Sequence, residues 1–227
     1  MTVLYVDLEH ERVLADPARA KGHLARREAG RARLAEAAGE GCDVVRFTEV
    51  SRERLEAVGP TAVVISGSTT DWAEYDPATL EPLVEAVRAA PVPILGICAG
   101  HQLIGRAHGA AWGPLGPLAP GEADPDPRFA PGQRKERGFL EVRLDTACPL
   151  FRGLESRADV FQSHYWHLVD VPEGFLRRAS SPWSPVQALE RLDRPVFGVQ
   201  FHPERYDQAH PAGLAVLRNF FEAARGR

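Results

Sequence analysis

The segment Pro93–Gln102 constrains the fold of this chain more than any other stretch. Residues 94–97 form a short apolar run, which is typical of a strand buried on both faces. Cys98 ends that run, and the helix-compatible segment Gly100–Ala107 follows at once. The pattern therefore predicts a buried strand that turns sharply into a helix at the cysteine.

Two glycines, Gly96 and Gly100, flank Cys98. A side chain at a sharp strand-to-helix turn needs small neighbours, because a Cβ there would clash with the turn or with the helix. The turn also places the sulfur at a helix N-terminus, where unpaired N–H groups favour a thiolate. The alternative is a buried, inert cysteine, which is common in protein interiors. The cysteine alone leaves both interpretations open.

A second segment, Val196–Glu204, is an apolar strand that ends in His202, Pro203 and Glu204. Proline favours extended backbone at the residue before it, and residues two apart in an extended segment point to the same side. We therefore expect Glu204 to lie beside the His202 ring, where it would orient the imidazole. Cys98, His202 and Glu204 then supply a nucleophile, a base and an orienting carboxylate.

The segments 96–102 and 198–204 together resemble the motifs of the class I glutamine amidotransferase family, which includes the glutaminase parts of GMP synthetase and anthranilate synthase. The resemblance implies an α/β fold of the flavodoxin-like kind, with a mixed, mainly parallel sheet and helices on both faces. It implies hydrolysis of the side-chain amide of L-glutamine through a cysteinyl thioester, with ammonia supplied to an acceptor or partner synthetase. No cofactor is expected. The resemblance favours a reactive Cys98.

The loop at residues 66–71 follows a short apolar strand, Ala62–Ile65. In the family the corresponding loop is glycine-rich and helps to hold the oxyanion, whereas here Gly67 is its only glycine. We expect the backbone N–H groups of Gly67 and Ala99 to form the oxyanion hole. An ordinary strand-to-helix loop is the alternative.

Substrate-binding residues are implied by the same resemblance. Ser163, His164 and Tyr165 would offer backbone groups to the α-amino and α-carboxylate ends of glutamine, and the Gln102 side chain would contact the same substrate. Packing at a strand end is the alternative for each of these residues. His164 and His167 are three residues apart, but no third ligand stands nearby in the sequence, so no metal is expected.

Length and composition favour a single α/β domain over residues 1–227, with 44% hydrophobic residues to fill its core. The net charge of -4 gives no reason to expect a nucleic-acid or membrane partner. The chain shows no signal peptide and no apolar run of transmembrane length, so we expect a cytoplasmic protein. Three irregularly spaced cysteines fit that compartment, with Cys42 and Cys148 as small hydrophobes.

Strands and helices alternate in the first half, which predicts a parallel sheet whose ligands bind at the carboxyl ends of the strands. The predicted strands are Val3–Asp7, Cys42–Phe47, Ala62–Ile65, residues 94–97, Gly138–Leu144, Ala158–Gln162, Phe175–Ala179, Val186–Arg191 and Val196–Phe201. The predicted helices are Pro17–Ala38 (capped by Asp16), Arg52–Ala57 (capped by Ser51), Thr79–Ala90, Gly100–Ala107 and Pro211–Ala224.

The segment Gly113–Gly132 holds six of the 19 prolines and four glycines, so it cannot form a helix or a central strand. It is too long for a routine connection. We expect it to gate the site or to dock the acceptor enzyme; an inserted loop without a role is the alternative. The segment Glu9–Gly22 is longer than its counterpart in the family and has no predicted role.

The predicted first helix carries several arginines. They could form a basic patch, but we expect a solvated face balanced by acidic neighbours. The residues concerned are Arg26, Arg27, Arg31 and Arg33, with Glu28 and Glu36 as the acidic neighbours.

Three functions remain open at this point: a glutaminase that supplies ammonia to a synthetase, a γ-glutamyl hydrolase that acts on a γ-glutamyl peptide or conjugate, and a non-catalytic regulatory subunit on the same fold. A binding role needs none of Cys98, His202 and Glu204, so their presence argues against the third. The form of the two motifs favours the first.

Overall fold

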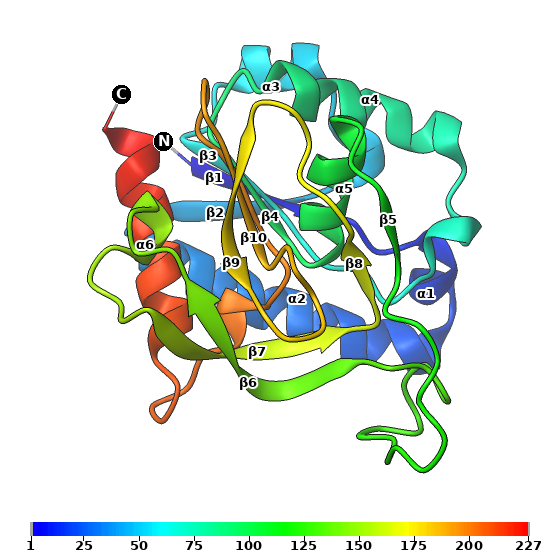
Figure 1. Cartoon of the computed structure of the whole chain (residues 1–227). Helices are drawn as coiled ribbons and strands as arrows, with labels where there is room; N and C mark the ends of the chain where they lie inside the picture. Colours follow the sequence, from blue (N-terminus) through cyan, green and yellow to red (C-terminus); the bar gives the residue numbers. More distant parts are fainter. Residues whose placement is uncertain (1, 227) are drawn as a thin grey trace.

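The structure is a computed structural model that describes residues 2–226. A nine-stranded sheet with the order β2-β1-β3-β4-β11-β10-β9-β6-β7 forms its centre (Figure 1). The strands are β1 (Thr2–Asp7), β2 (Gly41–Arg46), β3 (Ala62–Ile65), β4 (Ile94–Ile97), β5 (Trp112–Pro114), β6 (Glu136–Leu144), β7 (Arg157–His164), β8 (Trp166–Leu168), β9 (Phe175–Ser180), β10 (Ala188–Arg191) and β11 (Val196–Val199). The helices are α1 (Glu11–Ala15), α2 (Pro17–Ala38), α3 (Arg52–Val58), α4 (Pro77–Ala89), α5 (Ala99–Ala107) and α6 (Ala212–Arg225).

The sheet is mixed. Strands β2, β1, β3, β4 and β11 pair in parallel, whereas the pairs from β11 through β10, β9 and β6 to β7 are antiparallel. The short strands β5 and β8 form a separate antiparallel pair. The predicted α/β fold with a mainly parallel sheet in its first half is therefore confirmed.

Helices cover both faces of the sheet. On one face, α2 and α6 pack through Leu34, Leu217 and Phe220 against strand residues such as Val64 and Leu95. On the other, the apolar sides of α3, α4 and α5 meet the alternate side chains of the same strands. Each large apolar side chain that is fully buried here stabilises the fold by about 1.5–3 kcal/mol. The parallel strands β3, β4 and β11 are thus buried on both sides, as the sequence predicted for β4.

Local sequence fixes the ends of α2. The carboxylate of Asp16 accepts a hydrogen bond from the N–H of Ala18 at 2.9 Å, and Pro17 occupies the first helical position. Gly39 ends the helix with φ of 66°, a left-handed conformation that suits glycine. The predicted bounds of this helix are therefore confirmed.

Several other bounds differ from the prediction. Helix α4 begins at Pro77 rather than Thr79, because Asp76 caps it through the N–H of Ala78 at 3.0 Å. Strand β10 begins at Ala188 rather than Val186, and its register with β9 is irregular between Ala188 and Leu189. Strand β11 ends at Val199 instead of Phe201. The short elements α1, β5 and β8 were not predicted.

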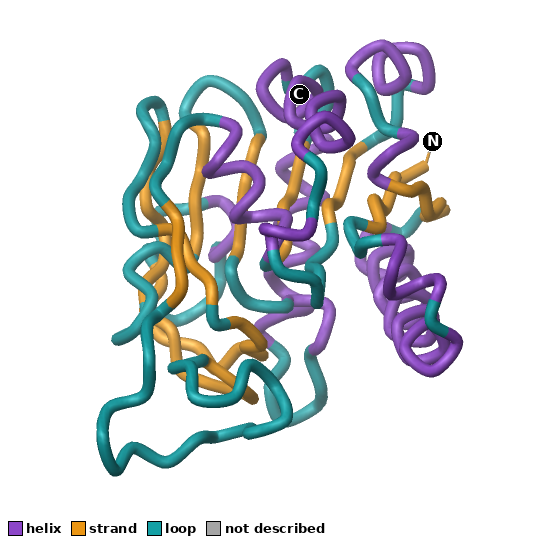
Figure 2. Tube along the Cα trace, turned by 90° about the vertical axis from the view of Figure 1, so that its right-hand side faces the viewer, coloured by secondary structure: helices purple, strands orange, loops and turns teal. Residues whose placement is uncertain are grey.

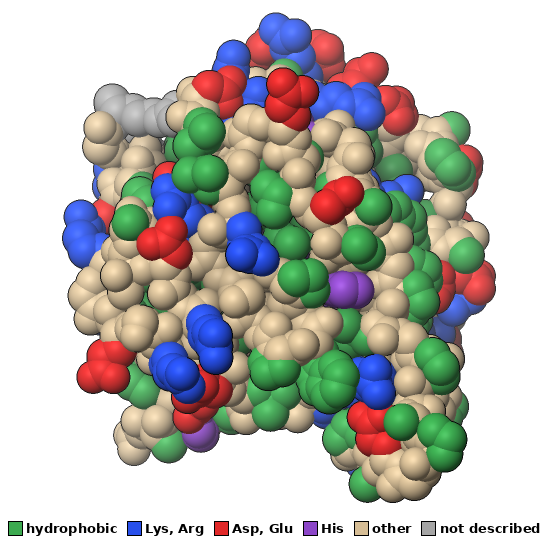
Figure 3. Space-filling model, in the orientation of Figure 1, with side chains coloured by type: hydrophobic (Ala, Val, Ile, Leu, Met, Phe, Trp, Pro, Cys, Tyr) green, Lys and Arg blue, Asp and Glu red, His purple; other side chains and the backbone are tan. Residues whose placement is uncertain are grey.

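The segment 115–134 projects from the bottom of the molecule in Figures 1 and 2, and Figure 3 shows it as a lobe with acidic and apolar side chains. The ammonium group of Lys135, whose side chain is fully buried, organises it. This group pairs with Asp124 at 2.8 Å and donates hydrogen bonds to the backbone carbonyls of Asp126, Phe129 and Ala130. One buried charge therefore holds together a segment that contains no helix and no strand of the main sheet.

No helix within residues 2–226 is both long enough and apolar enough to cross a membrane.

Candidate active site

Cys98 occupies a tight turn between β4 and α5. Its φ of 54° and ψ of -106° are unusual for a residue with a side chain, and such strain is typical of functional positions. A Cβ on Gly96 would lie 2.5 Å from the carbonyl carbon of Gly100, and a Cβ on Gly100 would lie 2.4 Å from the carbonyl oxygen of Ile65. The predicted need for small residues on both sides of Cys98 is therefore confirmed.

The carboxyl ends of three adjacent strands bring the predicted catalytic residues together. Gly67 follows β3, Cys98 follows β4, and His202 follows β11. A Cβ on Gly67 would lie 3.0 Å from Cε1 of His202 and 3.3 Å from the Cβ of Cys98. Gly67 thus lies against the side chains of both Cys98 and His202, and a larger residue in its place would push against them.

Glu204 lies beside His202, but for a different reason from the one expected. Its Oε1 is 2.7 Å from Nδ1 of the imidazole. The chain between them is not extended, because Pro203–Arg205 forms a 3-10 helix in which the N–H of Arg205 bonds the carbonyl of His202 at 3.0 Å. Proline suits the first position of such a turn. The expected contact is present, whereas the extended geometry proposed for it was wrong.

Helix α2 holds this turn in place. Nη1 of Arg33 donates hydrogen bonds to the backbone carbonyls of Glu204 at 2.8 Å and Tyr206 at 2.7 Å. The N–H of His202 bonds the carbonyl of Phe161 on β7 at 2.8 Å. The His202–Glu204 pair is therefore fixed from two elements that lie far away in the sequence.

The electrostatics at His202 favour the imidazolium. Burial by itself lowers the pKa of His202, but the negative charges of Glu204 and Cys98 and their hydrogen bonds outweigh it and raise the pKa to about 10. Nδ1 faces Glu204, which leaves Nε2 for the sulfur and for a substrate. The arrangement is that of a cysteine–histidine pair oriented by a carboxylate.

Glu9, which the sequence did not suggest, organises the loop that carries Gly67. Its buried carboxylate accepts hydrogen bonds from the N–H of Thr69 at 2.9 Å and from the hydroxyls of Ser68, Thr69 and Thr70 at 2.7–2.9 Å. Burial raises the pKa of Glu9, but these donors outweigh it and leave the pKa below its ordinary value. A carboxylate thus fixes a loop that, in the family's pattern, is rich in glycine.

Asp7 anchors α2 beside this loop. Its buried carboxylate lies 3.1 Å from Nε2 of His23 and from Nη1 of Arg27, both on α2, and 3.0 Å from Arg46 on β2. Burial raises the pKa of Asp7, but the hydrogen bond and charge of His23 and the charge of Arg46 hold it well below its ordinary value. Asp7 and Arg33 together position α2 along the site.

The side chain of Gln102 borders the smaller cavity, but most of its hydrogen-bonding groups are already bound by other residues of the protein. Its Nε2 donates to the carbonyl of Trp166 at 2.9 Å and to Oε1 of Gln200 at 3.0 Å, and its Oε1 accepts from Nε1 of Trp72 at 2.8 Å. Both amide hydrogens are used, so only one oxygen lone pair remains. A substrate contact of Gln102 stays a prediction, restricted to that lone pair.

The segment Ser163–Tyr165 lies at the end of β7, beside Cys98. The Sγ of Cys98 is 4.0 Å from the carbonyl oxygen of Ser163. The side chain of His164 is turned inward, with Nε2 2.9 Å from Glu136, while the hydroxyl of Tyr165 donates to Asp71 at 3.0 Å. The side chains therefore support the strand end, and backbone recognition of glutamine by these three residues stays a prediction.

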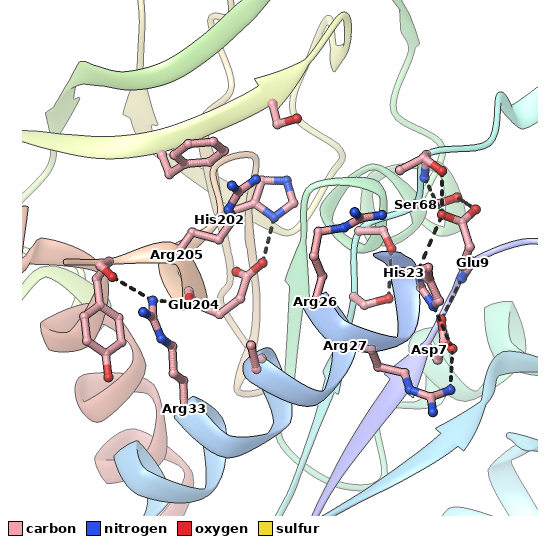
Figure 4. A pocket seen from close by; sticks show the side chains of 18 of the residues that line it. Asp7, Glu9, His23, Arg26, Arg27, Arg33, Ser68, His202, Glu204 and Arg205 are labelled. Atoms are coloured by element: carbon pink, nitrogen blue, oxygen red, sulfur yellow. Dashed lines mark hydrogen bonds and ion pairs between the residues drawn. The ribbon is translucent and has the colours of Figure 1, made fainter. Parts of the chain in front are cut away.

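Two adjoining cavities meet at the site. The smaller, of about 40 Å³, contains Cys98, Ala99 and Gln102 in its wall, and the larger, of about 640 Å³, contains Gly67, His202 and Glu204. Ser68, Thr69, Phe129 and Ser163 border both. Figure 4 shows the larger cavity, with Arg26 rising from α2 between His202 and Ser68.

The arginines of α2 form only part of the solvated face that we expected. Arg31 does pair with Glu28, at 2.6 Å. Arg26, Arg27 and Arg33 instead line the larger cavity. Arg26 is exposed, so the expectation holds for it. It was wrong for Arg27 and Arg33, which are half-buried and held by Asp7 and by the carbonyls of Glu204 and Tyr206, because the sequence could not show that the helix lies along the site.

The remaining titratable candidates are inert or structural. Burial raises the pKa of the thiols of Cys42 and Cys148 to about 12. Both are buried and unpaired, as expected for small hydrophobes. Among residues 2–226, no three or more metal-binding side chains are gathered in one place.

Comparison with known proteins agrees with this geometry. The sequence profile described as Glutamine amidotransferase class-I matches residues 31–224. A glutamine-hydrolyzing GMP synthase subunit from Pyrococcus abyssi is 30% identical over 168 residues, which cover 74% of this chain and 78% of that protein. Its counterpart from Thermococcus kodakarensis is 31% identical over 170 residues, with 75% and 79% covered. The match to the GMP synthase of Acetivibrio thermocellus, 28% identical over 180 residues, spans 79% of this chain but only 30% of that longer protein.

Solved structures share the fold. A candidate GMP synthase subunit from Thermoplasma acidophilum superimposes with a TM-score of 0.72 at 22% identity, covering 99% of this chain and 94% of the other. A glutamine amidotransferase from Thermotoga maritima gives a TM-score of 0.65 at 17% identity, covering 100% and 99%. With the profile matched over most of its length and the strand ends arranged as described, the chain belongs to the class-I glutamine amidotransferase family.

Proposed function

We propose that this protein hydrolyses the side-chain amide of L-glutamine with a Cys98–His202–Glu204 triad and supplies the ammonia to a partner synthetase. The observation that carries the proposal is that Cys98 and His202 lie close together at adjacent strand ends. Cys98 occupies a strained turn, and Nδ1 of His202 lies 2.7 Å from the Glu204 carboxylate. Neither a binding protein nor a regulatory subunit needs a strained cysteine beside an oriented imidazolium.

The reaction follows from the position of each group. The Cys98 thiolate attacks the amide carbon while the N–H groups of Gly67 and Ala99 stabilise the oxyanion. His202 gives its proton to the departing nitrogen, and ammonia leaves behind a γ-glutamyl thioester on Cys98. A water molecule activated by His202 then releases glutamate. Glu204 keeps the imidazole oriented in both steps.

The oxyanion role of Gly67 is supported by its place against both Cys98 and His202. Glu9 supplies the rigidity that this loop needs, because it ties three consecutive residues after Gly67 to one carboxylate. Substrate recognition is assigned to the backbone of Ser163, His164 and Tyr165 at the border of the smaller cavity.

A synthetase on a separate chain is the partner that the relatives support, because those matched over most of their length are named as glutamine-hydrolyzing subunits of GMP synthase. The proposal places the reaction in the cytoplasm and needs neither nucleic acid nor membrane. Three free cysteines fit a reducing compartment. Co-purification of the full chain from native extract, with identification of what remains bound, tests the partner.

The glutaminase proposal is tested by incubation with glutamine and with a glutamine analogue that carries an electrophile on its side chain. We expect release of ammonia and glutamate, and labelling of Cys98 that spares Cys42 and Cys148. Peptide mass spectrometry locates the label. Labelling of Cys42 or Cys148 in preference to Cys98 would contradict the assignment of the nucleophile.

A further inference from the structure

The buried side chain of Gln200 lies against the sulfur of Cys98. Strands β4 and β11 pair in parallel with Val199 opposite Ile97, and the N–H of Cys98 bonds the carbonyl of Val199 at 2.8 Å. Gln200 follows directly, so it stands beside the cysteine at the end of the neighbouring strand. Its Nε2 donates a hydrogen bond to the Sγ of Cys98 at 3.7 Å. A side-chain amide therefore faces the nucleophile.

The orientation of this amide matters, because its nitrogen donates a hydrogen bond to sulfur whereas its oxygen would repel a thiolate. The neighbouring amide of Gln102 settles the orientation. Its Oε1 accepts from Nε1 of Trp72 at 2.8 Å, and its Nε2 donates to the carbonyl of Trp166 at 2.9 Å. An indole N–H can only donate and a carbonyl can only accept. The reverse orientation of Gln102 would therefore oppose like groups at both contacts.

This fixed orientation passes on to Gln200. The second N–H of Gln102 donates to Oε1 of Gln200 at 3.0 Å. If the Gln200 amide turned over, its NH₂ group would meet the NH₂ group of Gln102, so Nε2 has to face Cys98. A donor chain of three side chains, Trp72, Gln102 and Gln200, thus directs one N–H group at the sulfur.

The end of the donor chain is dry. Gln200 is 0% exposed, Gln102 is 3% exposed, and Gln200 borders neither cavity. A buried amide needs partners for its hydrogens, and within residues 2–226 the partner of Gln200 Nε2 is the sulfur of Cys98. A thiol is a weak acceptor, whereas a thiolate accepts a charge-assisted hydrogen bond. The buried N–H group is therefore better satisfied by the thiolate than by the thiol.

The other groups that face the sulfur come from three further places. The carbonyl of Ser163, at the end of β7, lies 4.0 Å away and can only accept, so it favours the thiol. His202, after β11, is the titratable neighbour, and Glu204 holds the far side of its ring. Gly67, after β3, brings no charge. The neutral donor Gln200 thus opposes the carbonyl of Ser163.

We propose that Gln200 is a positioning residue that stabilises the thiolate of Cys98, and that Gln102 and Trp72 act through it by fixing the orientation of its amide. The inference deepens the proposed glutaminase and rests on Cys98 as its nucleophile. It gives Gln102 a role that does not depend on contact with the substrate.

The test measures how pH controls the reactivity of Cys98 in the absence of glutamine. The full-length protein is treated with iodoacetamide across a series of pH values, and peptide mass spectrometry follows alkylation of Cys98. Gln200→Met keeps the length of the side chain but removes the amide. We expect it to raise the pH of half-maximal alkylation rate by about one unit, a tenfold loss of thiolate at a given pH.

Steady-state kinetics give a second measurement on the same variant. The kcat for glutamine should fall by roughly tenfold, while KM should change little, because Gln200 borders neither cavity. Asn219→Leu is the matched control. It removes another buried amide, which bonds the carbonyls of Leu150 and Arg152 from α6 and not the sulfur. It should lower the Tm and leave the pH of half-maximal alkylation unchanged.

Gln102→Met tests whether the effect passes through Gln200. Without the donor of Gln102 the Gln200 amide is free to turn over, so this variant should raise the pH of half-maximal alkylation, but by less than Gln200→Met. Combined with Gln200→Met it should add nothing, because two residues that act through one contact are not additive. Additive shifts would overturn the donor chain.

The remaining outcomes separate this inference from the glutaminase. An unchanged pH of half-maximal alkylation in Gln200→Met, with glutamine turned over, would overturn the inference and leave the glutaminase intact, as would an equal shift in Asn219→Leu. If Gln200→Met does not fold, an unchanged pH in Gln102→Met overturns the inference and a raised pH supports it. The expected shifts in a protein that does not hydrolyse glutamine would support thiolate stabilisation by Gln200 and overturn the glutaminase.

Discussion

The carboxylate of Glu9 accepts a hydrogen bond from the backbone N–H of Thr69 at 2.9 Å, across 60 positions of the sequence. The same carboxylate bonds the hydroxyls of Ser68, Thr69 and Thr70. It therefore fixes the loop that presents Gly67 to the site. Glu9→Gln keeps the size of the side chain but introduces N–H donors opposite the N–H and hydroxyl donors of this loop.

We expect Glu9→Gln to lower the free energy of unfolding by about 1–3 kcal/mol, because it leaves buried donors without an acceptor. The kcat for glutamine should fall as well, since the oxyanion loop loosens. Denaturant unfolding gives the first quantity, and steady-state kinetics on the folded protein give the second. An unchanged kcat in a destabilised variant would limit Glu9 to a structural role.

Cys98→Ala should lower glutamine hydrolysis by roughly 10³-fold or more, because the reaction loses its nucleophile. Cys42→Ala is the control, since Cys42 is buried away from the site and burial raises the pKa of its thiol to about 12. Steady-state release of glutamate measures both variants. A comparable loss of glutamine hydrolysis in Cys98→Ala and Cys42→Ala would contradict the assignment of Cys98 as the nucleophile.

Gly67→Ala should reduce kcat by roughly 10²-fold, as a displacement of about 1 Å in a catalytic group can do. The added Cβ would lie 3.0 Å from Cε1 of His202 and 3.3 Å from the Cβ of Cys98, so the two catalytic side chains must move. Gly113→Ala is the control, because a Cβ there meets nothing within 4 Å. Near-normal kcat in Gly67→Ala would show that the site tolerates this contact.

The stability of the protein should depend on pH through His202. Its pKa is raised from 6.5 to about 10 in the fold, so the protonated ring stabilises the native state. That contribution is complete below about pH 6.5 and is lost as the pH rises toward 10. Glu204→Gln removes one of the negative charges that raise this pKa, so the Tm deficit of the variant should shrink between pH 6.5 and 10.

Scanning calorimetry across this pH range measures the effect, with Glu85→Gln on the exposed face of α4 as the control. The same Glu204→Gln protein should lose less activity than Cys98→Ala, because Glu204 orients the base and does not react. A Tm deficit that does not vary with pH would mean that Glu204 does not control the charge of His202.

The segment 115–134 borders the site through Phe129, which lines both cavities. The buried ammonium of Lys135 holds it by one ion pair and three carbonyl contacts. Lys135→Met removes these contacts, so we expect faster proteolytic cleavage of the segment and a several-fold change in KM for glutamine. Lys21→Met, on the exposed side of α2, is the control. If proteolytic cleavage of the segment accelerates but the basal and partner-stimulated glutaminase kinetics stay the same, the segment has no role in the reaction.

The sequence by itself determined the features that depend on neighbouring residues. The ends of α2 follow from Asp16, Pro17 and Gly39, and the turn at Cys98 follows from Gly96 and Gly100, because capping and steric clashes act over a few residues. The resemblance of two short motifs to a known family identified the residues that meet at the strand ends. Short elements such as α1 and β5 were not predicted, because they contain too few residues for a clear hydrophobic periodicity.

Only the tertiary structure decided what surrounds those motifs. It placed α2 along the site, through the pairing of Asp7 with His23 and Arg27, and so turned arginines that look like a solvated surface into the lining of a cavity. It also brought Glu9 to the loop after Gly67. Such contacts join residues tens of positions apart, and no periodicity or local propensity encodes them, because their geometry exists only once the parallel strands have paired and the helices have packed on them.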